Sequence, residues 1–141
     1  MQFLTGARPV SAFAESVSAR SSKVVDADSV FITLRFADGS NGVVAYLSEG
    51  DKALAKERME IFGAGRVFVL DDFRRATLYK DGRDEQVTLK AQDKGQQSQV
   101  RAVCASVLGG AAPISLDELE ATSRATFRVL DSLRERRPFE V

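Results

Sequence analysis

Residues 60–72, EIFGAGRVFVLDD, contain the parts of a nucleotide-binding loop: an apolar run, a Gly-x-Gly pair at Gly63 and Gly65, and two acidic residues. A dinucleotide loop also needs a third glycine, a helix that begins beside the pyrophosphate, and an acid about twenty residues further on. Here Phe68 occupies the third glycine's position, and the β-branched and aromatic run after Gly65 predicts a strand. The pattern therefore favours a β-hairpin in which Gly63 or Gly65 adopts a positive φ.

Two acidic pairs, Asp71–Asp72 and Asp26–Asp28, have the chemistry for metal binding or acid–base catalysis. Neither pair has a third ligand at a metal-motif spacing, and aspartate is common in turns between strands. The chain has no histidine, which is the commonest general base and metal ligand, and only one cysteine, Cys104. We therefore predict no metal ligands, no cofactor ligands and no catalytic residues within these 141 residues.

Three cationic residues are the candidates for binding a substrate. Lys56 and Arg58 follow the polar loop 48–55, where a strand is expected to begin, and Lys94 belongs to an Asp-Lys-Gly sequence ahead of a helix. Loops beside the rim of a sheet often carry binding residues. We predict that the three side chains contact a polar or anionic substrate at the rim of a pocket; a solvated surface is the alternative.

The composition is that of one ordinary globular domain spanning residues 1–141. Twenty basic and twenty acidic residues cancel and are interspersed, which disfavours binding to nucleic acid or to an anionic membrane. Cys104 lies in an apolar run, which predicts a buried thiol and a reducing compartment. Because the chain shows neither an export signal nor an apolar run of about 18 residues, we expect a cytoplasmic protein.

The first two thirds of the chain have the pattern of β-structure. Apolar residues alternate in SVFITLRF, and short runs rich in Val, Phe, Ile and Tyr are separated by turn residues such as Asp38-Gly39 and Asp81-Gly82. The connections are too short for crossover helices, so the sheet should be mainly antiparallel. The seven expected strands are residues 9–19, 29–36, 42–48, 58–62, 66–70, 75–79 and 85–89.

Two helices are expected after the strands. Residues 97–108 have apolar side chains at helical spacing and end at Gly109-Gly110. Ser115, with Glu118 three residues later, predicts the capped start of a second helix, which Pro138 ends. Its apolar face is expected to contain Leu119, Thr122, Thr126, Val129, Leu130 and Leu133. The predicted fold is α+β: an open, mainly antiparallel sheet with both helices packed on one face.

The second face of such a sheet would expose apolar side chains, among them Phe31, Val43, Ala45 and Leu47. Exposed apolar area of this kind commonly marks an interface. We therefore expect a homo-oligomer that forms by face-to-face packing of the sheets.

Several strings together resemble one family. They are residues 36–83, which include KE-x-x-E-x-F-G-x-G at 56–65 and DDFR at 71–74, then DKG at 93–95, and residues 109–141. This sequence resembles the C-terminal domain of the Gfo/Idh/MocA oxidoreductases over nearly its whole length. The resemblance implies an open antiparallel sheet that contributes to a substrate pocket and, in many members, packs against another subunit.

The resemblance also implies a longer protein with an N-terminal Rossmann domain that binds NAD or NADP. The implied reaction is hydride transfer between the nicotinamide and a hydroxyl-bearing carbon of a sugar, cyclitol or related polyol. The nucleotide loop and the family's catalytic lysine, aspartate and histidine would precede Phe3, and Gln96 stands where relatives often have histidine. We therefore expect an inactive chain truncated to the second domain, with a stand-alone interaction module as the alternative.

Overall fold

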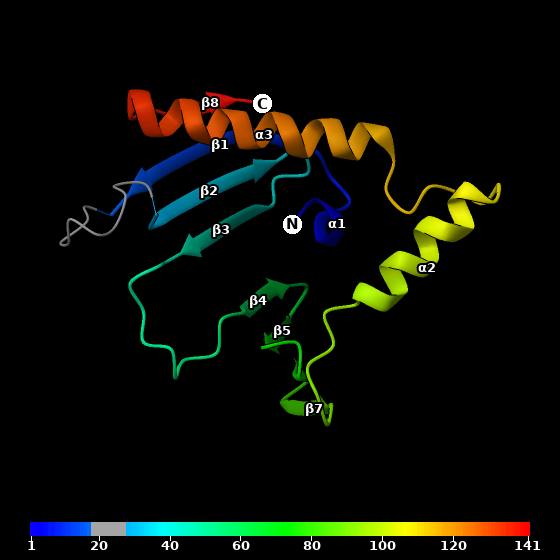
Figure 1. Cartoon of the computed structure of the whole chain (residues 1–141). Coiled ribbons are helices and arrows are strands. Elements are labelled where there is room, and N and C mark those ends of the chain that lie inside the picture. Colours follow the sequence, from blue (N-terminus) through cyan, green and yellow to red (C-terminus); the bar gives the residue numbers. More distant parts are fainter. Residues whose placement is uncertain (18–27) are drawn as a thin grey trace. The chain divides into compact units, whose positions relative to one another are not determined.

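The computed structural model describes residues 1–17 and 28–141, which form two compact units (Figure 1). The first unit contains Met1–Gly50 and Ile114–Val141, and the second contains Asp51–Pro113. Strands and helices occur in both, so the predicted α+β class is confirmed. None of the helices in the described ranges is both long and apolar enough to span a bilayer.

The first unit is built on an antiparallel sheet in the order β3-β2-β1-β8. Its strands are β1 (Pro9–Ser16), β2 (Val30–Phe36), β3 (Asn41–Tyr46) and β8 (Phe139–Glu140), and a short helix, α1 (Gln2–Thr5), precedes them. The turn predicted between the second and third strands is confirmed, because Gly39 has φ of 87° and the Asp38 carboxylate accepts a hydrogen bond from the Ser40 amide. Asp26 and the end of the predicted first strand lie outside the described residues.

The long helix α3 (Leu116–Glu135) runs along β1 (Figure 1). Its predicted start is confirmed, because the Ser115 hydroxyl and the Glu118 carboxylate form a reciprocal capping box. The residues that it buries are small, namely Ala121, Ala125 and Ser132. Opposite them, Ala12 and Ala14 of β1 are 0% and 1% exposed. Helix and strand therefore pack closely through alanine and serine.

This packing corrects the predicted apolar face of α3. Leu119 and Leu130 were expected to face the sheet, yet they are 49% and 45% exposed. Since β1 presents alanines to the helix, the space between them accepts only small side chains. Leu119 and Leu130 consequently lie away from the strand, whereas Val129 and Leu133, also predicted for this face, are partly buried.

Ser132 also completes the hydrogen bonding of β1. Strand β8 pairs with Ser11 and Ala12 but does not reach Ala14. The Ser132 hydroxyl accepts a hydrogen bond from the Ala14 amide at 2.9 Å and donates one to the carbonyl of Arg137 at 2.7 Å. A single buried hydroxyl thus joins β1 to the chain that follows α3.

The second unit contains an antiparallel meander in the order β4-β5-β6-β7. The strands are β4 (Arg58–Gly63), β5 (Arg66–Asp71), β6 (Arg75–Lys80) and β7 (Arg83–Thr88). Between β4 and β5, Ala64 and Gly65 have φ of 49° and 70°, which confirms a hairpin turn where the cofactor loop was rejected. All seven predicted strands are present, but with β8 they form two four-stranded sheets where one sheet was expected.

Helix α2 (Gln96–Val107) differs from the prediction in its packing. It buries none of its residues, and among the described residues of its unit it packs extensively on no strand. Of the two helices that were predicted to pack on a sheet face, only α3 therefore does so. Cys104, expected to be buried, is exposed because nothing in the described unit covers the apolar stripe on which it lies.

Candidate functional site

The three predicted substrate-binding residues all lie in the second unit, near one end of its sheet. Lys56 and Arg58 stand where β4 begins, which is also where β5 ends at Asp71, because Arg58 pairs with Asp71 in the strand register. Lys94 lies in the connector between β7 and α2. The structure thus brings Lys94 beside Glu57, the residue that precedes β4, although the two segments are far apart in the sequence.

Lys94 is held by an acid that sequence reasoning had not singled out. Its ammonium group forms an ion pair with the Glu57 carboxylate, and both side chains are only about one-third exposed. The hydrogen bond from Lys94 lowers the pKa of Glu57, and the positive charges of Lys94 and Lys56 lower it further against the opposing effect of burial. Glu57 is therefore ionised at neutral pH and fixes the position of the Lys94 head group.

Arg58 is engaged by a different acid. Its guanidinium donates two hydrogen bonds to one carboxylate oxygen of Glu60, at 2.7 and 3.0 Å, and this interaction raises the pKa of Arg58. On the neighbouring strands, the Arg75 guanidinium pairs with the Asp71 carboxylate at 2.7 Å. Arg58 thus belongs to a balanced group of surface charges.

The turn between β5 and β6 presents its carbonyl groups to the connector that leads to α2. Asp72 and Phe73 both have positive φ, 50° and 51°, an uncommon conformation for an aromatic residue. The Phe73 carbonyl accepts a hydrogen bond from the Asp93 amide at 3.1 Å. The Gln92 side-chain amide donates to the carbonyl and carboxylate of Asp72, at 3.0 and 2.8 Å.

Backbone contacts complete this polar network. The Asp72 amide donates to the Glu57 carbonyl at 2.7 Å, and the Leu89 amide donates to the Arg74 carbonyl at 2.8 Å. Three of the strings that carry the family resemblance, at 56–65, 71–74 and 93–95, therefore meet in space. Sequence reasoning missed Glu57, which lies in the first of those strings, and Gln92, which no pattern marked. It identified Asp72 only as one of an acidic pair at a turn, not as a hydrogen-bond partner of Gln92.

One atom of the network lacks a partner. The second carboxylate oxygen of Glu57, Oε2, is buried and has no hydrogen-bond partner among the described residues. A buried acceptor normally pairs with protein or water. The network can therefore hold a lysine in place and accept one further hydrogen bond, and it contains no nucleophile with an adjacent base. No group of acidic, cysteine or histidine residues in the described ranges could hold a metal.

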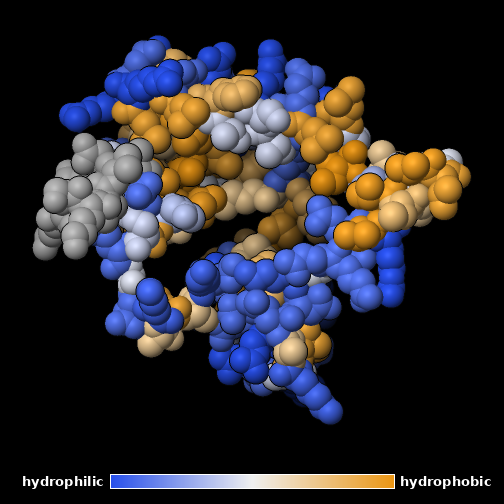
Figure 2. Space-filling model, in the orientation of Figure 1, coloured by the Kyte–Doolittle hydropathy of each residue, from blue (hydrophilic) through white to orange (hydrophobic). Residues whose placement is uncertain are grey.

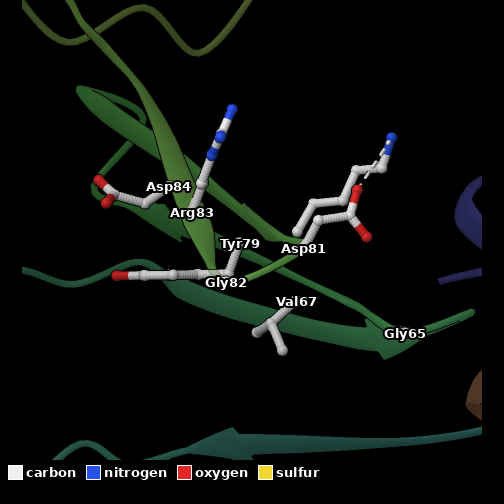
Figure 3. Close-up of a pocket in the computed structure, with 8 residues that line it drawn as sticks. Gly65, Val67, Tyr79, Asp81, Gly82, Arg83 and Asp84 are labelled. Atoms are coloured by element: carbon white, nitrogen blue, oxygen red, sulfur yellow. Dashed lines mark ion pairs between the residues drawn. The ribbon is translucent and has the colours of Figure 1, made fainter.

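The second unit also has a shallow depression at the opposite end of its sheet, with a volume of about 400 Å³ (Figure 3). It is formed by the turns after β4 and β6 together with Val67, Tyr79, Lys80, Arg83 and Asp84. None of the predicted substrate-binding residues lines it.

Comparison with known proteins identifies solved structures that have a similar fold. No protein-family model and no curated protein matches the sequence. Among solved structures, aldose-aldose oxidoreductase from Caulobacter crescentus is 20% identical, with a TM-score of 0.74 over 99% of this chain and 43% of its own. An oxidoreductase from Agrobacterium radiobacter, solved with NAD+, L-tartaric acid and magnesium, is 14% identical, with a TM-score of 0.77 over 99% of this chain and 45% of its own.

A third match is UDP-N-acetylglucosamine 3-dehydrogenase from Acidithiobacillus ferrooxidans, at 23% identity and a TM-score of 0.74, over 94% of this chain and 42% of that one. The chain has the fold of Gfo/Idh/MocA-type oxidoreductases. It spans less than half the length of these three proteins. The resemblance stated from the sequence is thereby confirmed at the level of the fold.

Proposed function

We propose that this chain is the C-terminal, substrate-binding and oligomerisation domain of a cytoplasmic, NAD(P)-dependent oxidoreductase acting on a sugar, cyclitol or related polyol. The observation that carries the proposal is the match of 94–99% of this chain to less than half of oxidoreductase structures. The nicotinamide and the catalytic groups would belong to a Rossmann domain outside this chain. The 141 residues alone would then bind no cofactor and catalyse no reaction.

The polar network supports a substrate-binding role for its cationic residues. Glu57 holds Lys94, so the ammonium group is positioned before a ligand arrives. Lys56 forms no ion pair within the described ranges, although its charge acts on Glu57. Arg58 is occupied by Glu60, which makes it the weakest of the three candidates.

The lysine roles are testable in the longer protein that carries this chain. Replacement of Lys56 with alanine should raise KM or lower kcat for the polyol about tenfold, because one charge-assisted hydrogen bond is lost. Arg75→Ala is the matched control, since Arg75 pairs with Asp71. Unchanged kinetics for the Lys56 variant would remove this residue from the site.

The open face of the first sheet supports self-association. Cross-strand pairing places Phe31 beside Ala45, and Thr33 beside Val43, on the face opposite to Ala12 and Ala14. Phe31 and Val43 are 45% and 63% exposed. Figure 2 shows hydrophobic side chains among the strands and helix of this unit. An apolar sheet face of this kind is suited to packing on the same face of a second copy.

Light scattering tests the self-association. At a protein concentration of about 50 µM the chain should have at least twice the mass of a monomer, and Val43→Asp should shift it toward the monomer because it places a charge in the interface. Thr33→Asp on the same face should act in the same direction, whereas Asp84→Asn in the second unit should not. A wild-type chain that is monomeric would contradict the proposal.

A second candidate is a stand-alone interaction module that retains the fold and lacks catalysis. The exposed apolar sheet face supports this candidate as well, because binding of a partner protein there would not require a substrate pocket. The coding sequence upstream of Met1 separates the two candidates. An in-frame Rossmann domain supports the oxidoreductase, and a complete reading frame that starts at Met1 supports the module.

A further inference from the structure

Three cationic side chains occupy directly opposed positions in the second sheet. They lie at the end where β4 turns into β5 and β6 turns into β7. The strand register pairs Arg66 of β5 with Lys80 of β6, and Lys80 with Arg83 of β7. All three residues are exposed. Directly opposed residues have Cβ atoms about 5 Å apart, and like charges at that separation are destabilising. This cationic row therefore raises the energy of the sheet unless negative charge compensates it.

The other end of the same sheet has no such imbalance. There the register aligns Arg58, Asp71 and Arg75, so that charge alternates from strand to strand. Asp71 pairs with Arg75 at 2.7 Å, and Arg58 pairs with Glu60 at 2.7 Å. The sheet thus neutralises its opposed charges internally at one end and leaves them with the same sign at the other.

The acids near the cationic row compensate it only in part. Asp81, in the turn after Lys80, pairs loosely with it, with 3.6 Å between Nζ and Oδ2 and 81% of the aspartate side chain exposed. Glu85 lies on the same face of β7 as Arg83 but makes no ion pair within 4 Å in the described part of the chain. Asp84 pairs across the strands with Tyr79 and therefore lies on the opposite face.

We propose that Arg66, Lys80 and Arg83 bind a diphosphate group of a small molecule. Neighbouring strands lie about 4.8 Å apart, so the row spans about 10 Å, enough for a lysine between two guanidinium groups to contact two linked phosphates. Arginine is suited to the outer positions because its planar fork binds phosphate oxygens in pairs. The site lies at the opposite end of the sheet from Lys94 and does not depend on the proposed function.

The surroundings leave room for such a group. Gly65 and Gly82 occupy the two adjacent turns at φ of 70°, and a side-chain carbon built on either glycine would meet no atom within 4 Å. The depression of about 400 Å³ is not the proposed binding surface, because it contains Val67, Tyr79 and Asp84, whose side chains lie on the opposite face of the sheet. In Figure 3 the Arg83 side chain extends away from the Tyr79 ring and the Asp84 carboxylate, as opposite sheet faces require.

Calorimetric titration of the protein with inorganic pyrophosphate at low ionic strength tests the site. Binding should be saturable, tighter than binding of inorganic phosphate, and weakened about tenfold by Arg83→Gln, because one bidentate contact is lost. Arg83→Lys should recover part of the affinity. Arg75→Gln, which removes the same charge at the balanced end of the sheet, should leave it unchanged. Circular dichroism confirms that each variant is folded.

The same titration can overturn the proposal. No saturable binding up to about 10 mM pyrophosphate, or equal loss of affinity in Arg83→Gln and Arg75→Gln, would show that the row is only a surface charge. Tighter binding of adenosine diphosphate than of pyrophosphate would assign the site to a nucleoside diphosphate, and equal binding would assign it to the diphosphate alone. Affinity for an oligonucleotide that rises with its length would replace the small molecule with a polyanion.

Discussion

The two units of the chain are stabilised in different ways. The buried apolar residues of the described chain all belong to the first unit: Ala12, Ala14, Val30, Phe36, Ala121 and Ala125. In the second unit the described residues include one buried residue, Thr77, and this unit is ordered by tight turns and by the network around Glu57. Close packing thus maintains one sheet, and local backbone geometry with polar contacts maintains the other.

The largest expected effect comes from enlarging a side chain in the packed unit. Ala14→Leu should lower the free energy of unfolding by about 1–3 kcal/mol, because the space between β1 and α3 accepts only small residues. The matched change is Ala76→Leu in β6, a residue that is only partly buried. It should change stability by less than about 0.5 kcal/mol. Urea unfolding of the two variants measures the difference, and equal losses would mean that the two sheets are packed alike.

A smaller effect, dependent on pH, is expected in the polar unit. Because Lys94 lowers the pKa of Glu57 below its ordinary 4.5, the carboxylate stabilises the fold above that pH, and the contribution is lost as pH falls through the lowered pKa. Glu57→Gln should therefore be less stable than the wild type at pH 7, and the two should converge in acid. Denaturant unfolding at several pH values measures this convergence.

The matched control for this pair lies in the first unit. Arg8 pairs with Asp117 at 3.0 Å, but both side chains are largely exposed, so Arg8→Gln should change stability by less than about 0.5 kcal/mol. A difference between Glu57→Gln and the wild type that persists unchanged to pH 3 would show that the carboxylate acts through packing and not through its charge.

Local features of the fold could be predicted from the sequence, and contacts between distant segments could not. The turn at Ala64-Gly65 and the capping box of Ser115 and Glu118 depend on adjacent residues, so short strings contain the whole signal. The pairing of Glu57 with Lys94 joins residues 37 positions apart, and no periodicity reveals it. In the same way, α3 buries alanines because β1 offers alanines, a condition that the helix sequence alone does not contain.

The substrate-binding role of Lys56, Arg58 and Lys94 stays a prediction. The sequence contained no indication that Glu57 and Glu60 hold Lys94 and Arg58. It also gave no indication that Arg66, Lys80 and Arg83 are aligned, because that alignment depends on the register of three strands. The register of a hairpin is fixed by the type and length of its turn, and the structure is needed to establish both.

The proposed function requires that these 141 residues have no binding site for the nicotinamide. Calorimetric titration of the 141-residue protein with NAD+, NADH, NADP+ and NADPH tests it most directly. No titration should reveal binding that depends on the nicotinamide, and any binding through the diphosphate should be weakened about tenfold by Arg83→Gln. Saturable binding with a dissociation constant of about 10 µM that survives Arg83→Gln would contradict the proposed function.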